Sequence, residues 1–249
     1  MTAGLQSIAP SDWIILFLVA GARLALPLAI PRFPLPAILA ALLLDGVDQS
    51  IFQQFTHLPL AGYQGYDKAL DIYYLTIAYI STLCNWQNRF ALQVSRFLFY
   101  WRLAGVALFE ITQARWLLPI FANTFEYFFI FYEAYRLRWD PRRLGRKALI
   151  GAAAAIWIVI KLPQEYWLHV AQIDTTDWIK TTLLGLPGST PWSEILAAHW
   201  LLVVALVVGL ALALWAGWRW LGPRLPPADY PLALDAEAHR SRFTTAQVR

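Results

Sequence analysis

The sequence predicts an all-α membrane protein, a bundle of about seven transmembrane helices with the N-terminus outside the cell and the C-terminus in the cytoplasm. Composition is the first reason, because 59% of the 249 residues are hydrophobic and only 14% are charged, whereas a soluble domain carries roughly 25% charged residues. Length is the second, because stretches of the about 20 apolar residues that cross a bilayer core of roughly 30 Å recur along the chain. The backbone groups at an open sheet edge would find no hydrogen-bond partners in lipid, so these stretches must be helices.

Breaker and polar residues mark the ends of most of the predicted spans. Residues 31–34, Pro-Arg-Phe-Pro, separate the first span from the second, and Asn85 ends the third. The fourth contains three charged residues, Arg96, Arg102 and Glu110. The Gly-Pro pair at 222–223 follows the last span, so both breakers sit at span ends. Neither suggests the broken helices typical of transporters, which weakens the transport hypothesis. The seven predicted spans are residues 13–30, 35–52, 67–86, 90–112, 115–136, 146–169 and 195–221.

The Lys and Arg residues predict the orientation, because short cytoplasmic loops are rich in them. Residues 136–147 contain six such residues, and residues 49–66 contain none. Counting spans outward from the basic loop gives a multi-pass protein of the cell (plasma) membrane. Residues 1–222 are expected to form one transmembrane bundle, and residues 223–249 a polar, Pro-interrupted cytoplasmic tail that is flexible.

Charges inside the fourth and fifth spans predict a ladder of buried ion pairs. A charge at the bilayer centre costs at least about 2.5–3.5 kcal/mol unless it is paired or hydrated. In an antiparallel hairpin, residues at equal depth have nearly constant sums of their residue numbers, and Asn123 should share an inward face with Glu126. Two interpretations remain open: the charges fix the hairpin, or Arg102 and Glu126 belong to a proton or ion path. The predicted pairs are Arg96 with Glu133, Arg102 with Glu126, and Glu110 with Arg115.

A second polar cluster is predicted at the outer ends of the spans. Asp67 and Asp71 lie four residues apart and share one helix face, as do Glu165 and His169. Such a cluster could hold a ligand or a divalent cation, because carboxylates suit Mg²⁺, Mn²⁺ or Ca²⁺ and imidazoles suit Zn²⁺. Acidic residues are also common at helix ends near water, so a structural role stays open. The cluster comprises Asp45, Asp48, Asp67, Asp71, Glu165, His169 and His199.

The spacing Asp45-x2-Asp48 followed by Asp67-x3-Asp71 resembles the motif of CDP-alcohol phosphotransferases. The resemblance implies four carboxylates bridging two helices around two metal ions. The sequence departs from the motif at Gln49, where the family has Gly, and no Ala-Arg pair follows. The predicted orientation also places these residues outside, whereas CDP-linked substrates are cytoplasmic.

Three functions follow from these features. The preferred hypothesis is a binding or transport role for a cation, small solute or lipid at a polar cavity in the outer half of the bundle. The second is a non-catalytic subunit or assembly factor that holds a membrane-protein partner, and the third a metal-dependent enzyme acting on a lipid-linked substrate. No motif indicates a cofactor. Nucleic acid is not expected as a partner, because topology explains the densest basic cluster.

Overall fold

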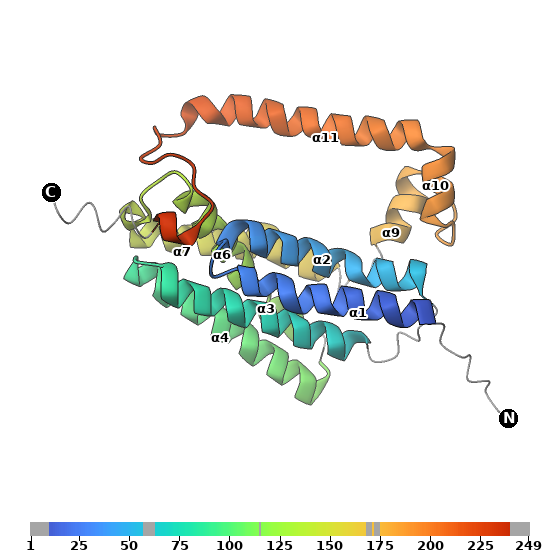
Figure 1. Cartoon of the computed structure of the whole chain (residues 1–249), viewed down its shortest axis with the longest axis horizontal. Coiled ribbons are helices and arrows are strands. Elements are labelled where there is room, and N and C mark those ends of the chain that lie inside the picture. Colours follow the sequence, from blue (N-terminus) through green and yellow to red (C-terminus); the bar gives the residue numbers. More distant parts are fainter. Residues whose placement is uncertain (1–9, 57–62, 115, 168–170, 172–174, 240–249) are drawn as a thin grey trace. The chain divides into compact units, whose positions relative to one another are not determined.

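The computed structural model describes residues 10–56, 63–114, 116–167, 171 and 175–239 (Figure 1). All regular secondary structure in these ranges is helical, which confirms the predicted all-α class. Contacts divide the chain into two compact units, residues 1–165 with 229–249, and residues 166–228. The predicted boundary at residue 222 rests on hydropathy, whereas contacts group residues 229–239 with the first unit.

The first unit is a bundle whose helices are joined by short connections (Figure 1). Pro34 stands at the first turn of its second long helix, where a missing N–H costs nothing and the fixed φ favours helix. The segments are α1 (Pro10–Ala25), the 3-10 helix η1 (Leu26–Ala29), α2 (Pro34–Phe55), α3 (Tyr63–Asn85), α4 (Arg89–Thr112), α5 (Leu117–Ile120), α6 (Thr124–Arg136), the 3-10 helix η2 (Pro141–Arg143), α7 (Arg146–Ala155), the π-helix η3 (Ile156–Lys161) and α8 (Leu162–Glu165).

Four helical segments of the described chain are long and apolar enough to cross a membrane. They overlap the predicted first, second, sixth and seventh spans. α3 and α4 have 23 and 24 residues, which suffices at about 1.5 Å per residue, but their composition is more polar than that of the four. The four segments are Pro10–Ala29, Pro34–Gln53, Arg146–Glu165 and Trp200–Arg224.

The predicted fifth span, residues 115–136, contains a break. Helix α5 ends at Ile120 and α6 begins at Thr124, and residue 115 lies outside the described ranges. α6 has 13 residues, about 20 Å of helix. The side chain of Asn123 caps α6 by accepting a hydrogen bond from the backbone N–H of Glu126 at 3.4 Å. The expectation that no span is broken was therefore wrong: an Asn cap, rather than Pro or Gly, starts this helix inside the span.

Helix α4 supports the break at two points. Trp101 Nε1 donates a hydrogen bond to the carbonyl of Ile120 at 3.0 Å, which satisfies a carbonyl left free where α5 stops. Gly105 allows the backbone of the break to come close, because a Cβ atom at Gly105 would lie 2.0 Å from Cβ of Phe121. The break is thus packed and hydrogen-bonded against α4.

The core of the first unit is aromatic and surrounds α6. Phe125, Phe128, Phe129 and Tyr132 are all fully buried. Trp86, at the end of α3, packs against this face, with its ring 3.8 Å from that of Tyr132. Rings provide large apolar area and prefer stacked or edge-on contacts, both of which occur here. α6 is therefore held rigidly from its cap to its last turn.

Residues 229–239 pack against the first unit, which corrects the prediction of a flexible tail. Arg32 pairs with Asp235 at 2.9 Å and with Glu237. Asp229 pairs with Arg143 at 2.7 Å. Backbone bonds add to these pairs, from Tyr230 N–H to the carbonyl of residue 138 and from residue 236 to that of Arg32. The tail is polar in composition, but its acidic side chains form ion pairs with Arg32 and Arg143, and these pairs hold it against the first unit.

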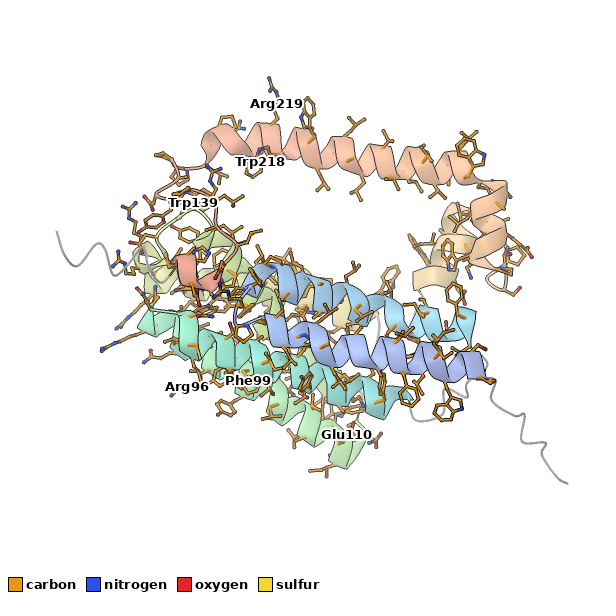
Figure 2. All side chains as sticks on the ribbon, in the orientation of Figure 1. Arg96, Phe99, Glu110, Trp139, Trp218 and Arg219 are labelled. Atoms are coloured by element: carbon orange, nitrogen blue, oxygen red, sulfur yellow. The ribbon has the colours of Figure 1, made fainter. Side chains whose placement is uncertain are left out.

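The second unit, residues 166–228, is also helical where the structure describes it. It contains α9 (Thr175–Trp178), the π-helix η5 (Ile179–Leu183), α10 (Trp192–Ala198), α11 (Trp200–Leu221) and the 3-10 helix η6 (Gly222–Arg224). No residue of the most apolar window of α11 is buried. Trp218 and Arg219 lie near its C-terminal end (Figure 2). An apolar helix without buried residues requires lipid or another protein around it.

Candidate functional site

Arg23 in α1 connects three helices through carboxylates. Its guanidinium pairs with Asp45 and Asp48 of α2 and, at 3.0 Å, with Asp67 of α3. Only 3% of the Arg23 side chain and none of the Asp48 side chain is exposed. A buried cation next to three acids needs this multiple pairing, because removing charges from water is costly. Arg23 was not among the predicted site residues, although it is the one charged residue inside the first predicted span.

Arg102 in α4 pairs with Asp71 of α3, where Nη2 lies 3.0 Å from Oδ2. Both side chains are largely buried, with 13% and 14% exposed. The Nη1 atom of Arg102 reaches the carbonyl of Phe121 at the helix break, at 3.5 Å. The Nε atom is buried and has no hydrogen-bond partner among the described residues.

Glu126 lies in the first turn of α6, where the helix dipole favours a negative charge. One carboxylate oxygen, Oε2, accepts hydrogen bonds from the hydroxyl of Tyr74 and, at 2.8 Å, from Nδ2 of Asn123. The other oxygen, Oε1, is buried without a partner in the described part of the chain. A buried acceptor left unpaired costs about 1–3 kcal/mol, more for a charged group.

These charges surround a polar cavity of about 170 Å³ inside the first unit. The walls come from α2, α3, α4, α6, η3 and α8, and include the capping residue of α6. Five carboxylates face two cationic side chains across it. Its lining residues are Leu42, Asp45, Asp67, Asp71, Arg102, Asn123, Glu126, Tyr127, Lys161, Gln164 and Glu165.

Lys161 is the second cation of the cavity. It closes the π-helix η3, a type of helix found mostly as short insertions and often at functional sites. Its side chain is buried, with 5% of the residue exposed, and its ammonium lies 4.1 Å from the centre of the Tyr127 ring. Within the described chain it forms no hydrogen bond or ion pair.

The ladder of pairs predicted for the fourth and fifth spans was wrong in its partners. Arg102 pairs with Asp71 instead of Glu126. Glu133 pairs with Arg136 at 2.7 Å and accepts a hydrogen bond from Trp86, so it does not meet Arg96. The reason is that α4 contacts α3 as well as α6, so equal depth alone does not select the neighbour.

The other two members of the ladder lie on the outside of α4. Both residues are exposed, and Figure 2 shows Arg96 pointing away from the other helices. Glu110 pairs with Lys68 at 2.9 Å, and half of its side chain is exposed. Arg115, its predicted partner, lies outside the described residues.

The predicted outer cluster is divided by the structure. Asp45, Asp48 and Asp67 lie around Arg23. Asp71 and Glu165 line the cavity together with Asp45 and Asp67, and buried Asn123 and Glu126 join them there from the other predicted set. His169 lies outside the described residues. His199 belongs to the second unit, where it precedes α11.

The metal interpretation of the outer cluster has no support from this geometry. Among the described residues, no group of three or more His, Cys, Asp or Glu is placed to hold a metal ion. The guanidinium of Arg23 occupies the space between the carboxylates that a cation would need. The four Asp residues whose spacing resembles the motif of CDP-alcohol phosphotransferases therefore pair with arginines in this structure. Three of them pair with Arg23, and Asp71 pairs with Arg102.

A second, larger hollow of about 520 Å³ lies between α4 and α7. Its walls are almost entirely apolar, including Phe97, Leu98, Trp101 and Trp157. Acyl chains would fill such a groove in a membrane without any specific contact. The charged cavity is therefore the candidate site.

No protein-family model matches the chain, and neither a curated protein nor a solved structure matches it.

Proposed function

We propose that the chain is a seven-span protein of the cell membrane that binds or transports a small solute at the polar cavity in its outer half. The observation that carries this proposal is the placement of Lys161 and Oε1 of Glu126, two buried and unpaired charged groups on one cavity. Buried ionisable groups inside a membrane are costly and are kept for function or pairing.

The helix break supports transport in particular. Transporters commonly form their sites from discontinuous helices, whose half-helix ends supply partial charges to the solute. Here the N-terminal turn of α6 lines the cavity through Asn123 and Glu126. The cavity is smaller than the roughly 300–1,000 Å³ of sites for drug-sized ligands, so a solute of few heavy atoms fits better than a lipid.

Seven spans, rather than four, follow from adding α3, α4 and the α5–α6 pair. Four of the charges of α3 and α4 that lower their hydropathy are paired, Asp71 with Arg102 and Lys68 with Glu110, which lowers the cost of placing these four in a bilayer. The basic loop 136–147 and the tail then lie in the cytoplasm.

Cysteine labelling tests the span count. In a Cys84→Ala background, Ala3→Cys and Ala228→Cys are labelled with a membrane-impermeant maleimide in intact cells and after permeabilisation. Seven spans predict immediate labelling at position 3, and labelling at 228 only after permeabilisation. Four spans would place both positions on one side, which would overturn the topology.

Solute binding tests the function. Thermal stability of the purified protein is measured with a panel of Na⁺, K⁺, small amines, small carboxylates and small amino acids. A stabilising solute should lose its effect in Glu126→Gln and keep it in Glu110→Gln, a matched change outside the cavity. A protein that responds to none of these probes would favour the non-catalytic subunit, for which the unburied surface of α11 offers a contact with a membrane-protein partner.

A further inference from the structure

The two unpaired groups of the cavity have opposite charges. Lys161 presents an ammonium with three donors, and Glu126 presents the acceptor Oε1. The two groups lie near each other in the cavity wall. The ammonium of Lys161 lies over the ring of Tyr127, which is the residue after Glu126. Both residues are more than nine-tenths buried.

A simple cation would satisfy only one of these groups. It could bind Oε1 of Glu126, but it would add a positive charge beside Lys161, which has no hydrogen bond or ion pair among the described residues. Repulsion between like charges is strong where water is scarce. A cation alone therefore leaves the ammonium without a hydrogen-bond acceptor among the described residues.

A simple anion is disfavoured by the same reasoning. It could bind Lys161 and the unpaired Nε of Arg102. It would also face Oε1 of Glu126 and the four other carboxylates of the lining. An anion alone therefore leaves Oε1 of Glu126 unpaired and adds a negative charge beside it.

We propose that the cavity takes a small zwitterion, a molecule with an ammonium and a carboxylate joined by a short carbon chain. This proposal rests on the proposed function and names its solute class. The carboxylate of the solute binds Lys161 and Nε of Arg102, and its ammonium donates to Oε1 of Glu126. Such a molecule pairs both groups and adds no net charge. The volume of about 170 Å³ limits it to a few heavy atoms.

Equilibrium binding to the purified full-length protein tests the solute class. The zwitterions glycine, β-alanine and γ-aminobutyrate are compared with ethylammonium and propionate, which each carry one of the two charges, and with Na⁺. At least one zwitterion should bind at least ten-fold more tightly than either single-charge probe. This comparison uses the wild-type chain, so it does not depend on a variant that folds.

Variants then locate the two ends of the solute. Lys161→Met should lower zwitterion affinity at least ten-fold without weakening any ethylammonium binding, because it removes a like charge. Glu126→Gln should likewise lower zwitterion affinity at least ten-fold without weakening any propionate binding. Lys68→Met and Glu110→Gln, the pair outside the cavity, should change neither. Equal affinity for ethylammonium and glycine, lost in Glu126→Gln, would overturn the zwitterion and keep a cation-binding function. Failure of every probe to bind would overturn both.

Discussion

Gly105 and Phe121 are in closer contact than any side chain at position 105 would allow, because an added Cβ would lie 2.0 Å from Cβ of Phe121. Gly105→Ala should therefore displace the break between α5 and α6. Overpacking of this kind costs about 1–3 kcal/mol. Unfolding of the purified protein in mixed micelles measures the loss of stability. Gly151→Ala is the matched control, because nothing lies within 4 Å of the Cβ that it adds, and helix propensity predicts an unchanged or slightly higher stability.

Arg23→Met should be among the most destabilising single changes in the first unit. It leaves three carboxylates without their cation, two of them on α2 and one on α3. Loss of one partner of a buried pair costs about 3–5 kcal/mol. Adding Asp48→Asn should recover part of that loss, since it removes the fully buried acid. A double variant no more stable than Arg23→Met would contradict this account.

Arg32→Met is the matched control for Arg23→Met. Arg32 also pairs with two acids, but 48% of its side chain is exposed. Exposed pairs contribute about 0–1 kcal/mol. A loss for Arg32→Met as large as that for Arg23→Met would show that burial does not set the difference.

Double-variant cycles identify the partner of Arg102. Arg102→Met combined with Asp71→Asn should be clearly non-additive, by about 0.5–3 kcal/mol, because their side chains are in direct contact at 3.0 Å. Arg102→Met combined with Glu126→Gln should couple less, because Glu126 is bound to Tyr74 and Asn123 instead. A larger coupling with Glu126 than with Asp71 would restore the original ladder.

Asp140 should make the first unit less stable as the pH falls into the acid range. Burial raises the pKa of Asp140, but hydrogen bonds from the side chain and backbone of Arg142 outweigh it, so the pKa lies below its ordinary value. An acid whose pKa is lower in the folded state stabilises the fold above the unfolded pKa of about 3.9, and this stabilisation is lost as the pH falls through the folded pKa. Unfolding between pH 2 and 6 measures it. Asp140→Asn should be less stable than wild type at pH 6 and approach it at the acid end, and a constant difference would exclude this linkage.

The sequence predicted the helices better than it predicted which helices are neighbours. The apolar lengths gave the helical class and located four segments that can cross a membrane. The three-residue spacing of Asn123 and Glu126 placed them on one face, and both line the cavity. Helical class, apolar length and shared helix faces are properties of one segment at a time, so a single sequence contains them. The choice of Asp71 by Arg102 depends on how α3 and α4 pack, which residue numbers do not contain.

The break before α6 and the role of Arg23 each have a signal in the sequence, but an average of hydropathy over a span hides both. The break before α6 begins at an Asn three residues before a Glu, the arrangement of a capping box. It was missed because the surrounding residues are apolar enough to suggest one continuous helix. Arg23 was missed for the same reason, since one charge hardly changes the average of a span. The docking of residues 229–239 depends on Arg32, a residue about 200 positions earlier, and local composition cannot show that.

The pairing of Arg23 has a consequence for how the protein is made. In a membrane, α1 is synthesised first and carries a cation whose partners on α2 and α3 do not yet exist. Inserting such a helix alone costs about 2.5–3.5 kcal/mol. The cost falls when α2 brings Asp45 and Asp48 beside Arg23, and falls again when α3 brings Asp67. The first three helices should therefore leave the translocation machinery for lipid together, and truncation after α1 should leave a helix that inserts poorly.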